Sequence, residues 1–210
     1  MKLYYGLNAC SLAPLIAATE AGIQLDLIKV DIYSTPHTLP DGSLFAEVNP
    51  RLYVPVLEFD DGSRLTEVAV LLQYLADQVP GSGLAPSRDE DRRYRLQEWL
   101  NFISSELHKA FSPWLFHAEL GQVAQDAVRV RLAGRLAWVE EQLAGRDYLL
   151  GSFSVADAYL FTILAWAKFT KVPLADFPNI LAWQARVAAR PAVREALRRH
   201  AGEPRSQAAA

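Results

Sequence analysis

The chain has 210 residues, of which 51% are hydrophobic and 21% charged, and its formal net charge is −3 at neutral pH. This composition is ordinary for a globular protein, and the length allows one large domain or two small ones. The acidic balance, without a basic stripe, argues against a nucleic-acid-binding surface. A single cysteine excludes an internal disulfide and a cysteine-based metal site. We find no signal-peptide pattern and no apolar run long enough to span a bilayer, so we expect a cytoplasmic protein.

Residues 2–22 predict a strand, a loop and a helix. Pro14 fits a first helical turn, where no N–H is needed, and Gly22 fits the helix C-terminus. Cys10 therefore lies at the helix N-terminus, where unpaired N–H groups and the helix dipole lower the pKa of a thiol. Two interpretations stay open from these residues alone. The cysteine is either a reactive thiol or a small apolar side chain of the core.

The remainder of the first eighty residues predicts further strands and helices in the order βαβ, then ββα. Apolar and charged side chains alternate at 26–32, which favours a half-buried strand. The loop that follows contains two prolines and a glycine. The other expected elements are a helical turn at 44–48, strands at 54–59 and 64–66 with a hairpin turn at 60–63, and a helix at 67–78.

From residue 87 onward the pattern predicts helices alone. They are expected at 89–116, 122–144, 155–169, 178–189 and 191–200. Pro113 should kink or end the first of them. Ser154 and Asp157 match a capping box, and the helix that follows is apolar nearly all round, so it should be the buried central helix.

The first of these helices also carries a polar stripe, apart from its apolar one. Asn101, Ser105 and His108 are spaced at i, i+4 and i+7. The stripe is either a set of functional side chains or an ordinary solvated helix face. The other histidines, His37, His117 and His200, have no such context, and we expect them at the surface.

Seven motifs together identify a family. They are KLYY at 2–5, ACSLAP at 9–14, NP-x3-VPVL at 49–57, LTE at 65–67, QYLADQVP at 73–80, EWLNFISSELHKAFSP at 98–113 and SVADAYLF at 154–161. The first half resembles a thioredoxin-like domain, in which the proline of a pair such as Val54-Pro55 is cis. The whole chain resembles a cytosolic glutathione transferase (glutathione S-transferase), and within that family the bacterial beta class.

This resemblance implies an α/β thioredoxin-like domain with a mixed sheet at residues 1–80 and an all-helical domain at 87–203. Residues 81–86 would be the linker and 204–210 a tail. It implies a detoxification enzyme that conjugates the thiolate of glutathione to small hydrophobic electrophiles and works as a cytoplasmic homodimer. Glutathione would be a co-substrate, with no cofactor, metal, nucleic acid or membrane involved. The alternatives are a thiol-disulfide exchange protein that uses Cys10, or a non-catalytic binding module of the same fold.

The resemblance also assigns roles to individual residues. The implied catalytic residues are Cys10 and His108, with Tyr5 and Ser11 as second candidates, whereas Tyr4 is interpreted as a plain strand residue. The implied glutathione-binding residues are Thr35, Tyr53, Val54, Pro55, Glu67, Val68, Asn101 and Ser105. The electrophile pocket would be lined by Leu7, Trp114 and Trp166.

Three positions near the implied glutathione site depart from the beta-class pattern. Thr35 lies in the loop where a lysine is usual. Val68 replaces a small residue, and Leu52 and Tyr53 precede Val54 where the family often has glycine and a short residue. We therefore expect weaker glutathione binding than in a beta-class enzyme that has the usual residues.

Overall fold

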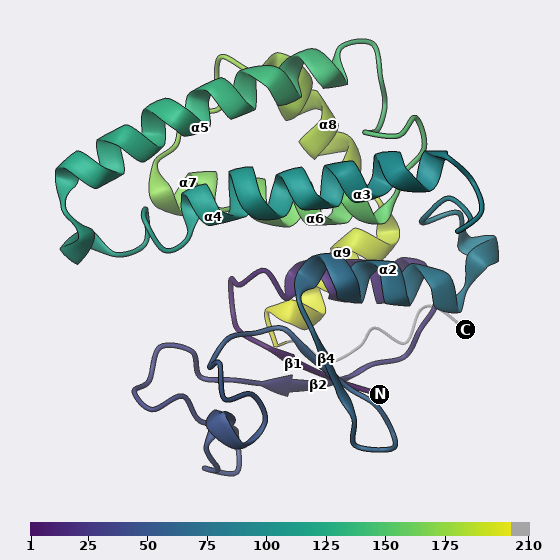
Figure 1. Ribbon diagram of the computed structural model, residues 1–210, viewed down its shortest axis with the longest axis vertical. Coiled ribbons are helices and arrows are strands. Elements are labelled where there is room, and N and C mark those ends of the chain that lie inside the picture. The colour runs from purple at the N-terminus through teal and green to yellow at the C-terminus, as the bar shows by residue number, and fades with distance from the viewer. Residues whose placement is uncertain (203–210) are drawn as a thin grey trace. The chain divides into compact units, whose positions relative to one another are not determined.

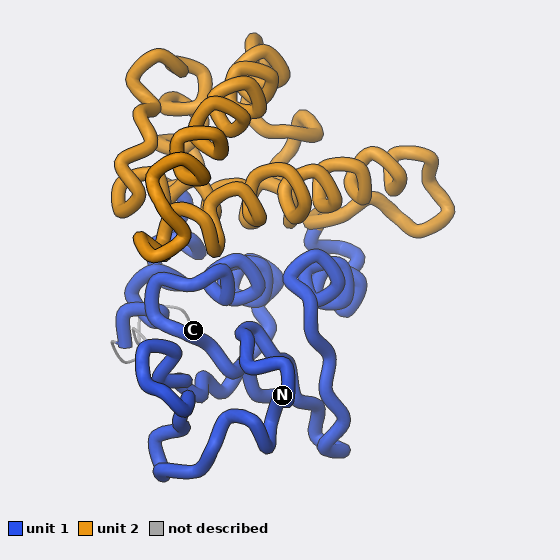
Figure 2. The backbone as a smooth tube through the Cα atoms, turned by 60° about the vertical axis from the view of Figure 1, so that its left-hand side comes forward, with its two compact units in different colours: residues 1–82, 190–210 blue, residues 83–189 orange. Residues whose placement is uncertain are grey.

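The structure, a computed structural model, describes residues 1–202 and divides into two compact units (Figure 2). Unit 1 joins Met1–Ser82 with the stretch that begins at Arg190, and unit 2 is Gly83–Ala189. The sequence placed the last helix in the helical domain, whereas α9 (Pro191–His200) packs against α1 (Leu12–Glu20) of unit 1. The reason is the buried face of α9, formed by Val193, Ala196 and His200.

A mixed sheet with the strand order β2-β1-β3-β4 organises unit 1 (Figure 1). β1 (Lys2–Tyr5) pairs in parallel with β2 (Asp26–Lys29) and antiparallel with β3 (Val56–Glu58), and β3 pairs antiparallel with β4 (Arg64–Thr66). The other elements are η1 (Phe45–Glu47), α2 (Val68–Gln78) and η2 (Pro80–Ser82). The predicted thioredoxin-like order and the mixed sheet are confirmed.

One face of this sheet packs against the long segment between β2 and β3. Phe45 of η1 is fully buried in a cluster with Tyr4, Val30, Val54 and Val56. Because Val54 belongs to this cluster, its packing holds in place the segment that leads into β3. Tyr4 is therefore the structural residue that the sequence indicated.

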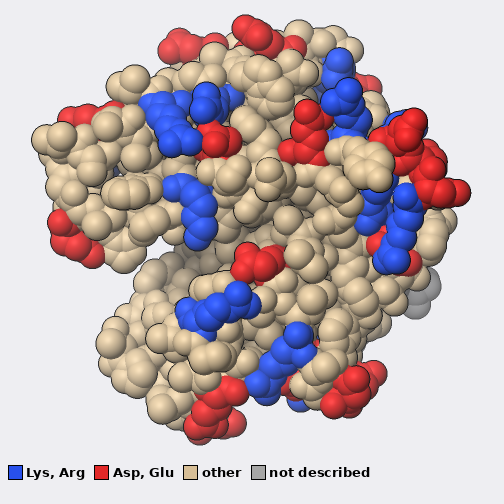
Figure 3. All heavy atoms as spheres, viewed as in Figure 1, with Lys and Arg blue, Asp and Glu red and all other residues tan. Residues whose placement is uncertain are grey.

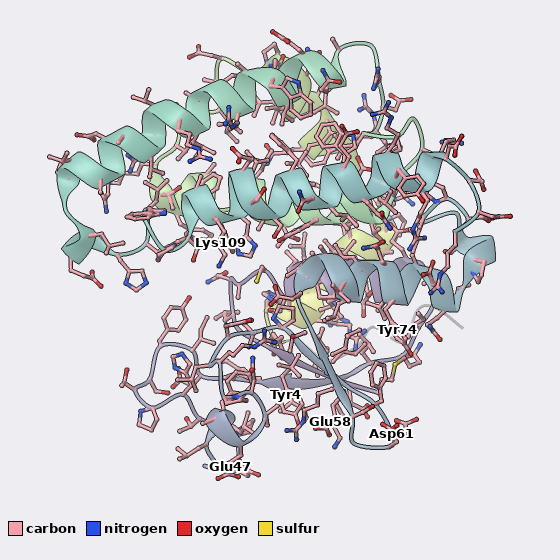
Figure 4. All side chains as sticks on the ribbon, viewed as in Figure 1. Tyr4, Glu47, Glu58, Asp61, Tyr74 and Lys109 are labelled. Carbon is pink, nitrogen blue, oxygen red and sulfur yellow. The ribbon has the colours of Figure 1, made fainter. Side chains whose placement is uncertain are left out.

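A carboxylate on the same face joins three strands to the η1 segment. Glu58 accepts hydrogen bonds from Lys2 Nζ at 2.9 Å and from Tyr4 Oη at 3.2 Å (Figure 4). It also accepts one from Arg64 Nε at 2.9 Å, and Arg64 Nη1 donates to the carbonyl of Glu47 at 2.9 Å. These donors, Lys2 first among them, hold the pKa of the Glu58 carboxyl below its usual range.

Unit 2 consists of helices in its described residues 83–189. They are α3 (Arg92–Phe102), the π-helix η3 (Ile103–His108), α4 (Lys109–Phe111), η4 (Ala118–Leu120), α5 (Gln122–Leu143), α6 (Val155–Leu164), α7 (Ala167–Thr170) and α8 (Pro178–Ala188). The long first helix ends before Pro113, as predicted. The expected helix at 155–169 is interrupted after Leu164 and resumes as α7.

The predicted capping box opens α6, and every residue of α6 is buried. Asp157 Oδ2 accepts the backbone N–H of Ser154 at 3.0 Å. Its Oδ1 accepts the N–H of Leu149 at 3.0 Å and Nε1–H of Trp183, from α8, at 2.9 Å. One carboxylate therefore fixes the start of the central helix, the preceding turn and a neighbouring helix.

Charges are mixed over the molecular surface. On the face in Figure 3, acidic and basic side chains lie interspersed within each unit. Ion pairs account for part of this pattern, such as Glu106 of η3 with Arg131 and Arg135 of α5. Among residues 1–202, no helix is long and apolar enough to cross a membrane.

Candidate functional site

The only cysteine lies in the loop between β1 and α1, directly before Ser11 at the helix N-cap. This is the predicted position. The Cys10 side chain is 7% exposed, and its Sγ donates a hydrogen bond to the carbonyl of Val54 at 3.5 Å. The Val54–Pro55 peptide bond is cis, as the resemblance implied, and it lies just before β3. The structure thus joins three predicted site residues, Cys10, Val54 and Pro55, in one place.

A second group of side chains surrounds the start of α2. Glu67 occupies the N-cap position with φ of 71°, a left-handed conformation that is uncommon for a residue other than glycine. Tyr53 Oη donates to Glu67 Oε1 at 2.8 Å, and Arg51 Nη1 lies 3.6 Å from the same oxygen. The Arg51 guanidinium also lies over the Tyr53 ring, 5.1 Å from its centroid. The Glu67 carboxylate is therefore exposed but held in one orientation.

The backbone at the start of α2 suits an anionic group. The first N–H groups of an α-helix have no acceptor within the helix, and the helix dipole adds positive potential there. Val68, the first residue of α2, contributes one of these N–H groups while its side chain is buried. Asn49 supports the segment from behind, since its Nδ2 donates to the Tyr53 carbonyl at 2.7 Å.

The two second candidates for catalysis, Tyr5 and Ser11, are both buried and both contact His200. Ser11 is fully buried, and its Oγ contacts the backbone of Gly6 and His200 Nε2. Tyr5 is 5% exposed and lies against the His200 ring, and burial raises the pKa of its phenol. His200 itself is 5% exposed, so its expected surface position was wrong. Thr35, by contrast, is exposed in the loop after β2.

In unit 2 the polar stripe begins in α3 with Asn101 and continues in the π-helix η3 with Ser105 and His108. Asn101 and Ser105 are exposed, and Ser105 Oγ donates to the Asn101 carbonyl at 3.0 Å. His108 is only partly exposed, and its Nδ1 lies 2.8 Å from Tyr159 Oη of α6. A π-helix bonds residue i to i+5, so Ser105 and His108 follow another spacing than that of a regular α-helix.

His108 sits in aromatic surroundings. Its ring packs edge to face on Trp166, with centroids 5.1 Å apart. Burial lowers the pKa of the His108 imidazole from 6.5 to about 4, and the positive charge of the neighbouring Lys109 has a smaller effect in the same direction (Figure 4). His108 is therefore a neutral imidazole at physiological pH, able to donate one hydrogen bond and accept one.

The predicted electrophile residues are distributed over both units. Leu7 lines a hollow of about 410 Å³ in unit 1, together with Tyr33 and Leu39. In unit 2, Trp114 is 39% exposed, and Trp166 is buried beside His108, Phe111 and Phe116. No group of three metal-ligating side chains occurs within residues 1–202.

Comparison with known proteins identifies the family. The model of the glutathione S-transferase N-terminal domain matches residues 9–78, and that of the C-terminal domain matches residues 102–191. The chain belongs to the glutathione S-transferase family. It is 41% identical over 198 residues to Glutathione S-transferase GstA of Escherichia coli O157:H7, a match that covers 94% of this chain and 97% of the relative.

Solved structures of glutathione S-transferases agree with this assignment. A ternary complex of BphK, a bacterial glutathione S-transferase, has a TM-score of 0.92 and 49% identity, and the match covers 96% of this chain and 100% of BphK. The beta-class enzyme of Sphingomonas chungbukensis has a TM-score of 0.90 and 39% identity, with 95% and 98% covered. The predicted resemblance to the bacterial beta class of glutathione S-transferases is confirmed.

Sequence reasoning missed four residues that shape this glutathione S-transferase site. Arg51 and Asn49 orient Glu67 and Tyr53, yet the sequence indicated only that both lie within the motif at 49–57. Tyr159 fixes the His108 ring, and it occurs within a motif that was identified for its capping box alone. His200 reaches the thiol loop from the other end of the chain, and no local pattern indicates such a contact.

Proposed function

We propose that this protein is a transferase that joins the sulfur of glutathione to small hydrophobic electrophiles. The observation that carries the proposal is the contact between Cys10 Sγ and the Val54 carbonyl. It places the one thiol of the chain beside backbone that can pair with the cysteinyl part of glutathione, in the manner of strand addition. In the reaction, glutathione loses its thiol proton, a carbon–sulfur bond forms, and the leaving group departs from the electrophile.

The start of α2 is proposed to bind the γ-glutamyl end of glutathione. That end carries an ammonium and a carboxylate, which need partners of opposite charge. Glu67 supplies an oriented carboxylate for the ammonium, and the N–H of Val68 offers a donor for the carboxylate. Tyr53 and Arg51 would keep Glu67 in place before the ligand arrives, which reduces the ordering cost of binding.

Roles for residues of unit 2 are part of the proposal as well. With Tyr159 Oη donating to Nδ1, the proton of the neutral His108 imidazole is on Nε2, which makes this nitrogen a hydrogen-bond donor for a thiolate. Asn101 and Ser105 remain proposed glutathione contacts, and Leu7, Trp114 and Trp166 remain proposed contacts of the electrophile. The proposal includes a cytoplasmic homodimer with a role in detoxification.

Cys10→Ala is expected to abolish adduct formation while part of the conjugating activity persists. The native protein should gain the mass of one glutathione when exposed to oxidised glutathione, because Cys10 is its only thiol. Conjugation should continue in part, since His108 can still stabilise a bound thiolate. Intact-mass spectrometry and a chloronitrobenzene assay measure the two properties, with Val193→Ala as a control that keeps the thiol. Reduction of a mixed disulfide without any conjugation would contradict the proposal and favour thiol-disulfide exchange.

Val68→Ser and Thr35→Lys are each expected to strengthen glutathione binding. Serine adds a hydroxyl beside the helix start, and a hydrogen bond to a charged group is worth roughly 1.5–3 kcal/mol. Lysine at the exposed loop adds an ion pair worth up to ~1 kcal/mol. Together the two effects correspond to about one to three orders of magnitude in affinity. Calorimetric titration measures this effect, and Gln78→Lys, at the far end of α2, controls for added charge. Equal affinities for all four proteins would refute the expectation.

We expect a dimer at micromolar concentration. Two-fold closure is the commonest assembly of soluble proteins, and members of this family pair through their two domains. Light scattering coupled to size exclusion gives the mass directly. A monomer mass would argue against this part of the proposal.

A further inference from the structure

The loop that carries Cys10 is closed by one hydroxyl group. Ser11 Oγ accepts the N–H of Gly6 at 3.2 Å and donates to the carbonyl of the same residue at 3.2 Å. That carbonyl also accepts the N–H of Ala9 at 3.2 Å. Both ends of the loop are thereby tied together, with Cys10 next to the hydroxyl that ties them.

Gly6 lies close to the side chain of Ile32. A Cβ atom at this position would come within 2.8 Å of Ile32 Cδ1, so a larger residue would require the Ile32 side chain to shift. Both polar backbone groups of Gly6 are bonded to the Ser11 hydroxyl, so this hydroxyl is the side-chain group that closes the loop.

A histidine from the far end of the chain completes the bonding of that hydroxyl. His200 Nε2 lies 3.4 Å from Ser11 Oγ, and the two residues are 189 positions apart. When the ring proton of His200 is on Nε2, His200 donates to Ser11 Oγ, and the hydroxyl then has one donated and two accepted hydrogen bonds, its full capacity. The His200 ring also packs against Tyr5, with centroids 5.3 Å apart, so β1 and α1 hold it on two sides.

His200 is suited to this contact because it is neutral. It is 5% exposed, and burial lowers the pKa of its imidazole from 6.5 to about 4, against the smaller opposing effect of a hydrogen bond with the Gly6 backbone. A neutral imidazole with its proton on Nε2 donates to Ser11 and leaves no buried charge.

We propose that His200 is a positioning residue for Cys10. His200 acts through Ser11 and Gly6 and holds the thiol loop in the geometry that directs Cys10 Sγ at the Val54 carbonyl. The last helix of the chain thereby controls the order of the first loop. The consequence for glutathione rests on the proposed function, whereas the order of the loop does not.

The order of the loop is measured by hydrogen–deuterium exchange of a peptide spanning residues 3–12 in the full chain. His200→Ala removes the donor to Ser11, and loss of a hydrogen bond should speed local exchange by up to about tenfold. His200→Gln should restore slow exchange, because a glutamine amide can donate to Ser11 Oγ as the imidazole does. Ser11→Ala should match His200→Ala, and the double variant should add little to either.

Val193→Ala is the matched control. Val193 is fully buried on the same face of α9, so this change weakens the packing of the helix and leaves His200 in place. It should leave the exchange of residues 3–12 near the native rate. Native exchange in His200→Ala, or equally fast exchange in Val193→Ala, would overturn the proposal, and so would a failure of His200→Gln to restore protection.

Kinetics of conjugation tests the consequence separately. His200→Ala should raise KM for glutathione several-fold, up to about tenfold, while His200→Gln and Val193→Ala stay near native. If the native protein conjugates nothing, the proposed function fails, and the exchange measurement still decides the role of His200. A third outcome is faster exchange in His200→Ala with an unchanged KM for glutathione. It would show that His200 orders the loop without positioning the thiol for glutathione, and it would overturn the proposal.

Discussion

Asp157→Ala is expected to lower the free energy of unfolding by about 3–5 kcal/mol, because it leaves several buried donors without an acceptor. Asp157 is fully buried, and its two oxygens accept from Leu149 N–H, Ser154 N–H and Trp183 Nε1–H. Each unsatisfied buried donor costs roughly 1–3 kcal/mol. Urea denaturation followed by circular dichroism measures the change.

Two further variants show whether the acceptor pattern is the cause. Asp157→Asn should be nearly as damaging as Asp157→Ala, because its NH₂ group would face the Ser154 N–H that Oδ2 now accepts. Ser154→Ala keeps the carboxylate and loses one capping hydroxyl, so it should cost only about 1 kcal/mol. Comparable losses in Ser154→Ala and Asp157→Ala would show that the cap, rather than the network around Asp157, carries the stability.

Features that depend on neighbouring residues were predictable from the sequence. The capping box at Ser154, the turn before β4 and the position of Cys10 before α1 follow from spacing and from residue types. The apolar run at 155–164 predicted burial, since a helix without a polar face has nowhere else to lie. Most helices and strands were therefore predicted to within a few residues.

Features that depend on contacts between distant parts of the chain could not be predicted from the sequence. His200 belongs to a short, charged helix, and only the packing of α9 on α1 takes its side chain out of water. The π-helix at Ile103–His108 has no compositional signal, so a regular helix was expected there, and the contact of His108 with Tyr159 could not be predicted. The left-handed conformation of Glu67 could not be predicted either, because its side chain is held by contacts with Tyr53 and Arg51 that the local sequence does not indicate.

The protein is expected to lose stability as the pH falls from 6.5 toward 4. His108 and His200 each have a pKa lowered by burial from 6.5 to about 4 in the folded state. Between pH 4 and pH 6.5 the unfolded chain binds more protons than the folded one, so the free energy of unfolding rises with pH. On acidification through this range the contribution of the two histidines is lost. At 1.36 kcal/mol per pKa unit, each histidine contributes about 3 kcal/mol at neutral pH that is gone below pH 4.

Other groups titrate in or near the same window, so variants must isolate the histidines. Burial raises the pKa of Asp157, which acts in the opposite direction, while the lowered pKa values of Glu58 and Glu106 act in the same direction at lower pH. His200→Gln and His108→Gln cannot take up a proton, so each should show a shallower fall in unfolding free energy between pH 7 and pH 4.5 than the native chain. His117→Gln is the matched control, because that imidazole is exposed and paired only with Glu119 in the described structure. Urea titrations at several pH values give the slopes, and a slope unchanged by both buried variants would mean that neither histidine is kept neutral by the fold.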